Sequence, residues 1–408
     1  MNAAIINIGN ELLLGKTLNT NMMFLGSKLA QLGIPVEYAV TIQDSPEAIQ
    51  QALAATWEKY SIVISTGGLG PTDDDLSKAS IARFFGKELR FDEEVWNHVQ
   101  ALFSRRNKAI PDLNRGQAMV PDGFEALKND LGTAPGLHFT VANKHFFALQ
   151  GVPSEMKHIF EEHITGIIAE SFSQIKPIHV RTIHTHGISE SGLAELYPVK
   201  SLPKNVSVAW LPQTGRVDIR FYGSDRNGVE EAVIQAERVI GNLVWAYDDI
   251  SPAAVLLKLL EERAYTISLA ESCTGGLVQK MLSDIPGASK CFVGGVVTYS
   301  NDMKHKVLGV SDETLETFGA VSEACVLAMA RGIKDLTNSN VAVSVSGIAG
   351  PDGGTTEKPV GFVYFGYQIG NKFWSSQQIF NGDRDSIRYK ASEFAILELI
   401  RELQGRKN

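Results

Sequence analysis

Residues 61–79, SIVISTGGLGPTDDDLSKA, place a glycine-rich loop between an apolar run and the start of a helical pattern. Two earlier apolar runs, at 3–9 and 36–42, also end in glycine or polar residues. Amphipathic helical patterns lie between the runs, at about 19–33 and 46–59. Buried strands that alternate with crossover helices predict a mainly parallel sheet in three layers. The fold class expected from this part is therefore α/β.

The length and composition agree with a multidomain globular protein. At roughly 150 residues per domain, 408 residues predict two or three domains. Hydrophobic residues make up 44% and charged residues 21%, which excludes a disordered chain. No run approaches the roughly 20 apolar residues that a membrane span needs, and the N-terminus reads as a strand rather than a signal peptide. We expect a cytoplasmic protein without a membrane partner.

Charge and cysteine content exclude two further classes. The net charge of −8 argues against wholesale binding of nucleic acid. The three cysteines, Cys273, Cys291 and Cys325, are widely spaced and form no CxxC pair. The sequence therefore predicts neither a disulfide framework nor a thiolate zinc site.

The pattern of elements divides the chain into three parts. Residues 1–172 form the three-layer α/β part, and residues 173–248 mix three strand-like runs with one long amphipathic helix, as a small α+β module would. Residues 249–408 are again α/β, with an antiparallel hairpin expected near GFVYFGY and KFWSSQQ. The turn formers in YDDISP, at 247–252, mark the expected linker.

The first candidate site is the loop TGGLGPTDDD, at the carboxyl edge of the expected sheet. Its glycines let the backbone approach a ligand closely, and successive N–H groups before a helix suit a phosphate. Three acids at the helix start, Asp73, Asp74 and Asp75, are either first-turn residues favoured by the helix dipole or ligands of a divalent cation. The loop matches neither GxxxxGK[ST] nor GxGxxG, which disfavours a P-loop NTPase or a Rossmann dehydrogenase. The expected nucleotide-binding residues are Glu11, Asn21, Thr66, Gly67, Gly68, Gly70 and Thr72.

The second candidate site is AESCTGG, at 270–276, which follows a strand and opens a helix. Such a turn exposes a serine beside converging backbone N–H groups, so Ser272 is the candidate nucleophile. Cys273 competes with it, because a helix N-terminus lowers a thiol pKa. The expected base is Lys304 with Tyr299, since a desolvated lysine can be neutral near pH 7. The alternative is that Lys304 is an ordinary helix-surface lysine and Tyr299 a half-buried strand residue.

A third glycine loop, SVSGIAGPDGG at 344–354, also follows a strand and could form a wall of the same pocket. Arg384 in NGDR could pair with a phosphate through two hydrogen bonds, and Arg388 one turn later may equally be solvated. The expected substrate-binding or oxyanion-binding residues are Thr274, Gly275, Gly276, Ser289, Ser346, Gly347, Gly350 and Arg384.

These motifs together resemble one family. IGNELLLG, STGGLGPTDDD, NDLGTAPG and LQGVPSEM look like the molybdopterin-binding (MogA/MoeA-like) domain at the N-terminus of the CinA family. AESCTGG, VTYSNDMK, SGIAGPDGG and NGDR resemble its C-terminal domain. The middle segment resembles the KH-like domain of the family but lacks the GxxG loop of a nucleic-acid-binding KH module.

The resemblance implies two hydrolytic activities. The C-terminal domain would deamidate nicotinamide mononucleotide (NMN) to nicotinic acid mononucleotide and ammonia, without a cofactor, through Ser272, Tyr299 and Lys304. Ser289 and Arg384 would hold the ribose or phosphate. The N-terminal domain would be an ADP-ribose pyrophosphatase with a divalent metal on Asp73–Asp75, and a monovalent cation beside it is a further candidate. Together they would make a salvage hydrolase for pyridine nucleotides, with small-molecule partners and a homodimeric state. The alternative is a nucleotide- or pterin-binding protein that acts through competence or DNA-repair partners without catalysis.

Overall fold

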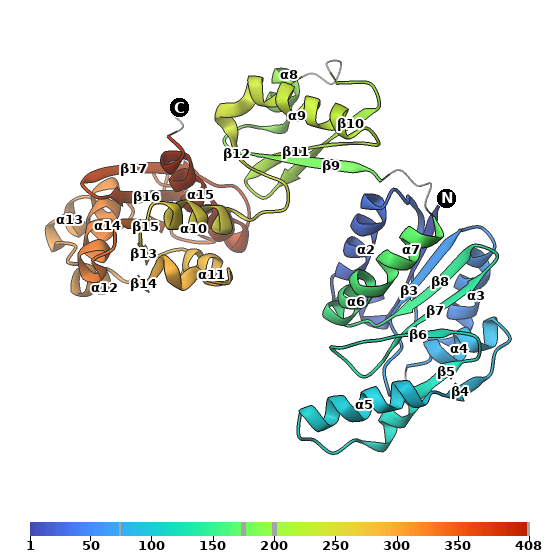
Figure 1. Ribbon diagram of the computed structural model, residues 1–408. Helices are drawn as coiled ribbons and strands as arrows, with labels where there is room; N and C mark the ends of the chain where they lie inside the picture. The colour runs from blue at the N-terminus through green and yellow to red at the C-terminus, as the bar shows by residue number, and fades with distance from the viewer. Residues whose placement is uncertain (73–74, 173–176, 198–201, 406–408) are drawn as a thin grey trace. The chain divides into compact units, whose positions relative to one another are not determined.

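The protein divides into two compact units, Met1–His179 and Val180–Asn408. The computed structural model describes residues 1–72, 75–172, 177–197 and 202–405 (Figure 1). The middle segment expected as a separate module falls in the second unit, together with the C-terminal segment. The three-part division therefore stays a prediction.

The first unit is built on a mixed six-stranded sheet. In spatial order its strands are β2 (Val36–Ile42), β1 (Ala3–Ile8), β3 (Ile62–Thr66), β8 (Lys144–Leu149), β7 (Gly136–Val141) and β6 (Glu125–Leu127). The first four strands are parallel, and β7 and β6 are added antiparallel. A separate antiparallel pair joins β4 (Leu89–Phe91) to β5 (Met119–Pro121). The mainly parallel sheet predicted from the sequence is confirmed.

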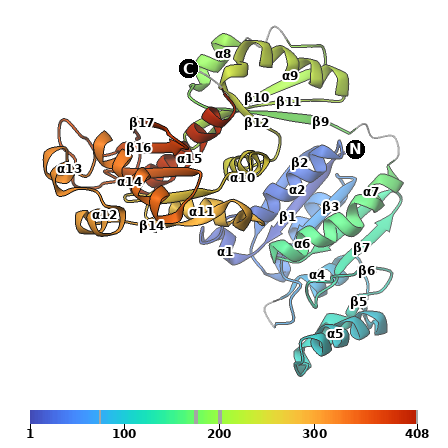
Figure 2. The ribbon, with the colours of Figure 1, turned by 60° about the vertical axis from the view of Figure 1, so that its left-hand side comes forward.

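Helices cover both faces of this sheet, as a three-layer fold requires. Ile6 of β1 packs on one face against Leu53 and Ile81, whereas Ile5 packs on the other against Leu25 and Phe160. Helices α2 and α6 lie over one face (Figure 2). The helices of the unit are α1 (Asn10–Leu13), α2 (Thr20–Gln31), α3 (Pro46–Trp57), α4 (Ser77–Phe84), α5 (Glu93–Arg105), α6 (Pro153–Ile159) and α7 (Thr165–Ser171).

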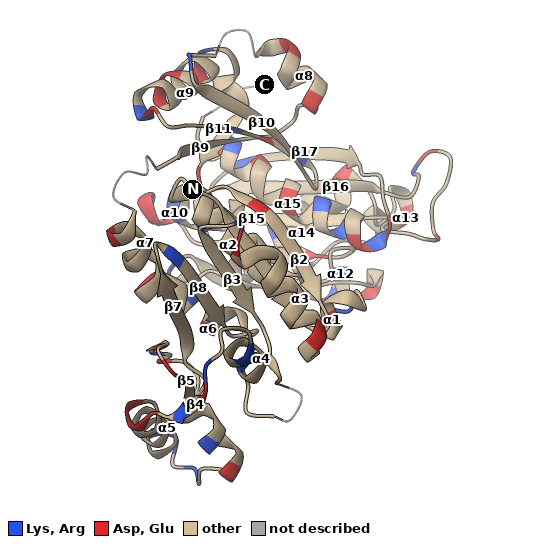
Figure 3. Ribbon diagram, turned by 90° about the vertical axis from the view of Figure 1, so that its right-hand side faces the viewer, with Lys and Arg blue, Asp and Glu red and all other residues tan. Residues whose placement is uncertain are grey.

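The second unit contains two sheets. The smaller is antiparallel where its pairing is defined and has the order β10 (Val206–Gln213), β11 (Arg216–Gly223), β9 (His179–Thr185) and β12 (Val244–Tyr247). Helices α8 (Glu190–Leu196) and α9 (Arg226–Ile240) accompany it. Both signs of charge occur on α9 and on the final helix α15 (Arg384–Leu403) (Figure 3).

The larger sheet has the order β14 (Phe292–Val297), β13 (Ile267–Glu271), β15 (Val341–Gly347), β16 (Phe362–Ile369) and β17 (Lys372–Ile379). Its first three strands are parallel, and β16 and β17 form the predicted antiparallel hairpin. The remaining helices are α10 (Pro252–Glu262), α11 (Leu277–Ser283), α12 (Asn301–Leu308), α13 (Asp312–Thr317) and α14 (Glu323–Thr337). Core residues of α10, α11 and α15 pack on one face and those of α14 on the other, which confirms the α/β class here too.

None of the helices within the described residues combines the length and apolar character that a membrane span requires.

Candidate active site

The carboxyl ends of the parallel strands of the larger sheet meet at one edge. Strand β13 ends at Glu271, which lies opposite Val297 of β14 and Val345 of β15. The chain then turns at Ser272, whose N–H donates to the carbonyl of Val345 at 2.9 Å. The turn AESCTGG and the segments after β14 and β15 therefore lie side by side, as the sequence predicts for parallel neighbours.

Ser272 and Lys304 are brought into direct contact. The lysine Nζ donates to Ser272 Oγ at 3.0 Å and to the carbonyl of Thr298 at 3.0 Å. Helix α12 places it there, because Ser300 caps the helix and Lys304 lies one turn inside it. Lys304 is 1% exposed and Ser272 7% exposed. Lys304 is thus not the helix-surface lysine of the alternative interpretation.

Burial has an electrostatic consequence for this pair. Removing the ammonium from water lowers the pKa of Lys304, although Cys325 and Cys273 act in the opposite direction. A lysine with a lowered pKa is neutral over a wider pH range and can accept the proton of a serine hydroxyl. The arrangement can therefore generate an alkoxide-like nucleophile at Ser272.

Tyr299 lies at the rim of this site. Its side chain is 61% exposed, and its hydroxyl accepts a hydrogen bond from Arg384 Nη2 at 2.9 Å. Its backbone carbonyl, at 3.5 Å, is the atom that contacts the Lys304 amine. Arg384 also donates to the carbonyl of Gly350. Hydrogen bonds from Arg384 therefore connect Tyr299 and Gly350 next to the serine–lysine pair.

The N–H groups of the glycine turn after Ser272 do not have the role that the sequence predicted. The N–H of Gly275 donates to the carbonyl of Ser272 at 3.1 Å, and the N–H of Gly276 donates to the Glu271 carboxylate at 2.9 Å. These two donors are engaged within the turn, so they are not free for an oxyanion as the sequence suggested. Thr274 is fully buried, and its hydroxyl has no partner among the described residues.

The loop after β15 serves both packing and the site. Ser346 donates its hydroxyl to the carbonyl of Ala320 at 2.7 Å. A Cβ at Gly347 would come within 2.8 Å of the Phe362 carbonyl, so a larger residue does not fit. Of this loop, the Gly350 carbonyl reaches the site residues through Arg384.

Ser289 lies away from the serine–lysine pair. It is exposed and precedes β14, in the turn Ala288–Lys290, whereas Tyr299 follows that strand. A six-residue strand spans about 20 Å, which separates the two sheet edges. Within this chain, Ser289 is therefore not part of the same constellation.

Sequence reasoning left the role of Arg388 open, and the structure brings this residue to the serine turn. Its Nη2 donates to the carbonyl of Thr274 at 2.9 Å and would lie 3.2 Å from a Cβ at Gly275. The signal was its spacing, four residues after Arg384, which puts both guanidinium groups on one face of α15.

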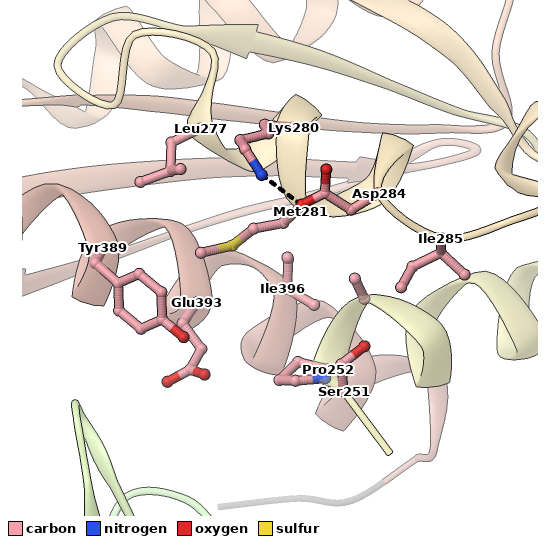
Figure 4. Close-up of a pocket in the computed structure, with 11 residues that line it drawn as sticks. Ser251, Pro252, Leu277, Lys280, Met281, Asp284, Ile285, Tyr389, Glu393 and Ile396 are labelled. Atoms are coloured by element: carbon pink, nitrogen blue, oxygen red, sulfur yellow. Dashed lines mark hydrogen bonds and ion pairs between the residues drawn. The ribbon is translucent and has the colours of Figure 1, made fainter. Parts of the chain in front are cut away.

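A cavity of about 330 Å³ lies between α10, α11 and α15 (Figure 4). Leu277 and Met281 of α11 face Tyr389 and Glu393 of α15 across it. Ser272 and Lys304 do not line this cavity, so it is distinct from the site described above.

In the first unit, the predicted polar residues cluster at the carboxyl ends of β3 and β8. Asn21 Nδ2 donates to Thr66 Oγ1 at 3.0 Å and to the carbonyl of Gly151 at 2.9 Å. Thr66 donates in turn to the carbonyl of Gln150 at 2.7 Å. The Oδ1 atom of Asn21 is buried and accepts no hydrogen bond from a described residue. Asn21 and Thr66 are therefore brought together, whereas Glu11 is exposed in the first turn of α1.

The glycine loop of this unit packs closely on the protein itself. A Cβ would approach the Ile8 carbonyl to 2.1 Å from Gly67 and the Ser77 hydroxyl to 2.2 Å from Gly68, and both glycines have positive φ. A Cβ at Gly70 would lie 2.3 Å from the Asp75 carboxylate. Glycine is needed here to let the loop close, whatever it binds.

Of the three expected metal ligands, the described residues include only Asp75. Asp75 accepts hydrogen bonds from the N–H and the hydroxyl of Thr72, at 3.0 and 2.6 Å. Asp73 and Asp74 lie outside the described residues. In the part of the chain that the structure describes, no group of three or more His, Cys, Asp or Glu residues could hold a metal ion.

Lys78 of α4 is a further basic group that sequence reasoning missed near this loop. Its Nζ donates to the carbonyl of Gly116 at 2.9 Å, and burial lowers the pKa of Lys78 to about 8 against the opposing effect of Asp75.

Fold and site define an α/β protein of two units, of which the second pairs a serine with a buried lysine at the carboxyl edge of its sheet. Two family models match the chain: "CinA C-terminal domain" over residues 250–403 and "Probable molybdopterin binding domain" over residues 4–170. A relative from Caldanaerobacter subterraneus subsp. tengcongensis is 38% identical over the full length of both chains. A CinA-like protein of Dictyoglomus thermophilum is 39% identical over 95% of this chain and 96% of its own. The chain belongs to the CinA family.

Solved structures are also similar to part of the chain. A CinA superfamily protein from Klebsiella pneumoniae is 34% identical and covers 38% of this chain and 96% of its own, with a TM-score of 0.37. The protein CinA from Thermoplasma acidophilum is 34% identical and covers 41% and 98%, with a TM-score of 0.38.

Proposed function

We propose that the second unit hydrolyses the carboxamide of nicotinamide mononucleotide to nicotinic acid mononucleotide and ammonia. The observation that carries the proposal is the 3.0 Å contact between Ser272 Oγ and the buried Lys304 amine. A serine that can pass its proton to a neutral lysine is one arrangement that allows acyl transfer without histidine. The family resemblance supplies the substrate.

The reaction proceeds in two steps that balance. Ser272 Oγ attacks the carboxamide carbon while its proton passes to Lys304 Nζ. The C–N bond then breaks, and Lys304 returns the proton to the leaving nitrogen, which departs as ammonia. Water then attacks the acyl-enzyme while its proton passes to Lys304. The bond to Ser272 Oγ breaks, Lys304 returns that proton to the serine oxygen, and the acid product loses its own proton to solvent and leaves as the carboxylate.

The rim residues suit the rest of the substrate. Arg384 is exposed at the start of α15, and its guanidinium can pair with the phosphate of the mononucleotide. Arg384 is hydrogen bonded to the Tyr299 hydroxyl, and the Tyr299 carbonyl contacts the Lys304 amine. Tyr299 would then link the phosphate-binding arginine to the proposed base.

The test is ammonia release from NMN by the wild type, Ser272→Ala and Lys304→Met. Both variants should lose at least about 10³-fold in kcat, the usual cost of removing a nucleophile or its base. Ser283→Ala, an exposed serine of α11, is the matched control and should retain wild-type activity. Equal rates in wild type and Ser272→Ala would exclude the nucleophile. If the wild type releases no ammonia, the amidase proposal is excluded, and the alternative of a binding protein without catalysis remains.

For the first unit we propose hydrolysis of ADP-ribose. The buried Oδ1 of Asn21, which accepts no hydrogen bond from a described residue, lies next to Thr66 and favours a polar ligand at this sheet edge, and the Lys78 amine could face a phosphate. A divalent metal belongs to this proposal, with Asp73, Asp74 and Asp75 as its candidate ligands. We expect ADP-ribose turnover that stops in EDTA and in Asp74→Ala, whereas Asp112→Ala on the turn before β5 retains it. Turnover that survives EDTA would exclude the metal.

The assembly and place of action also remain part of the proposal. A homodimer that works on small nucleotides in the cytoplasm follows from the family resemblance and would be tested by the mass of the purified protein in solution.

A further inference from the structure

Two nucleophiles follow each other at the end of β13, and the sequence does not choose between them. Ser272 faces Lys304, whereas Cys273 is 6% exposed and packs in the apolar core shared by α10, α11 and α15. A cysteine before a helix would ordinarily become the stronger nucleophile, because the first N–H groups of the helix stabilise its thiolate. Burial in this core opposes that effect, and a feature of the turn acts in the same direction.

Glu271, the last residue of β13, occupies those N–H groups. Its side chain is buried, at 1% exposure. Its carboxylate accepts hydrogen bonds from the N–H groups of Gly276 at 2.9 Å, Val278 at 3.2 Å and Gln279 at 2.8 Å. These are the donors that open α11 and would otherwise have no partner in the helix.

We infer that Glu271 is a positioning residue that selects Ser272 over Cys273 as the nucleophile. Its carboxylate takes up the N–H groups at the start of α11, places a negative charge beside Cys273 and fixes the turn so that Ser272 faces Lys304. The inference rests on the proposed amide hydrolysis and adds to it the reason why the serine reacts.

The electrostatics of the thiol agree with this geometry. The pKa of Cys273 is raised to about 12, mainly by burial and also by the charge of Glu271, while backbone hydrogen bonds from Cys273 and Thr274 and the charge of Lys304 act in the opposite direction. At neutral pH the thiol therefore stays protonated, although it adjoins a helix start. The backbone of Glu271 also ties the site together, because its carbonyl accepts from the N–H of Thr298 at 2.8 Å, next to the carbonyl that holds Lys304.

The test is Glu271→Gln with two readouts on the full chain. The first is the kinetics of ammonia release from NMN. The second is the rate at which iodoacetamide alkylates Cys273 at pH 8, measured by peptide mass spectrometry with Cys291 as an internal reference. Cys291 is buried too but lies before β14, at the other edge of the sheet.

A glutamine has one carbonyl oxygen and no charge, so it cannot hold all three donors or oppose a thiolate. We expect kcat to fall at least about tenfold with KM within about twofold. The Cys273 to Cys291 alkylation ratio should rise about tenfold, the effect of one pKa unit on the thiolate fraction. An unchanged ratio would overturn the selection role even if kcat falls, because kcat alone would then report only a looser turn.

Two further outcomes are separated by design. If wild type releases no ammonia, the amidase proposal fails, and the alkylation ratio still decides whether Glu271 suppresses the thiol. If both cysteines of the Gln variant react equally fast, the variant has unfolded and Glu271→Asp replaces it. Aspartate keeps the charge but has a shorter reach, so the ratio should stay within about twofold of wild type while kcat falls; a tenfold rise in that ratio would overturn the inference.

Discussion

Lys304 is the residue on which the proposed chemistry depends most. A lysine acts as a base only in its neutral form, and burial is the main reason why its pKa is lowered from 10.5. Lys304 lies one helical turn after the Ser300 cap, and this position brings its amine to Ser272 Oγ rather than into solvent. The chemistry is thus built from one short helix and one strand end.

The lowered pKa of Lys304 predicts the pH dependence of the amidase. As pH rises, the lysine loses its proton, so kcat should rise through the lowered pKa and level off below pH 10.5. The measurement is kcat for ammonia release between pH 5 and 10. Lys304→Arg, which stays protonated throughout, should lose the rise together with the activity. A flat profile in the wild type would show that Lys304 is not the base.

Helix α15 links the substrate rim to the serine turn at the scale of elements. Its first turn carries Arg384, which holds Tyr299, and one turn later Arg388 holds the Thr274 carbonyl. The helix is long and mostly buried from Ala391 onward, so its packing fixes where both guanidinium groups lie. We expect the helix start to be a determinant of activity rather than of stability.

Arg388→Met tests this role of α15. The variant keeps much of the apolar side chain but loses the donor to Thr274, and a hydrogen bond from a charged group is worth about 1.5–3 kcal/mol. We expect kcat/KM for NMN to fall about 10- to 100-fold, while the free energy of unfolding in urea falls by no more than the contribution of this hydrogen bond, about 1.5–3 kcal/mol. Lys390→Met on the same helix, which removes a contact to the Asn381 carbonyl, is the control and should retain activity. A loss of the same size in both variants would contradict a specific role for Arg388.

At the scale of the whole molecule, a buried polar network joins the smaller sheet to α15 within the second unit. Arg216 of β11 donates to the Glu393 carboxylate and lies 3.4 Å from Asp218, which in turn lies 3.0 Å from His184. Next to this network, the His186 ring packs at 5.5 Å from the Phe394 ring. These contacts join the middle segment to the C-terminal segment, and both belong to one compact unit.

His186 makes the stability of this contact depend on pH. Burial lowers the pKa of His186 from 6.5 to about 4, and the positive charges of Arg401 and Arg216 add to the effect. Below pH 6.5 the unfolded state binds a proton that the folded state does not accept until about pH 4, so stability falls as pH falls through this window. The loss for this residue should reach about 2 kcal/mol at pH 5 relative to pH 7, at 1.36 kcal/mol per unit.

The measurement is the free energy of unfolding in urea at pH 7 and pH 5, for wild type and His186→Gln. The variant should lose less stability on acidification than wild type. His184 provides a control of opposite sign: burial lowers its pKa, but its hydrogen bonds to Asp218 and to the Asp248 carbonyl raise it overall. His184→Gln should therefore lose more stability than wild type on acidification. Identical slopes in wild type and His186→Gln would contradict the assignment.

The class of fold could be predicted from the sequence because it depends on local patterns. Apolar runs that end in glycine loops and alternate with amphipathic helices specify parallel strands with crossovers, and these patterns lie within short windows. For the same reason the sequence places Ser272, Tyr299 and Lys304 after neighbouring strands. The sequence could not show that Lys304 is buried. The buried and exposed faces of a helix repeat with the same period, and a single turn is too short to tell them apart.

Tertiary structure alone decided how the groups of the site are used. The N–H groups of Gly275 and Gly276 are engaged because the chain folds back to Ser272 and Glu271, and Ser289 is distant because it precedes a strand whose other end holds the site. Arg388 reaches Thr274 only because α15, more than 100 residues later, packs beside α11. A hydrogen bond forms only where its donor and acceptor atoms lie close together. The sequence specifies residue types and local periodicity, but it does not show which distant residues become neighbours.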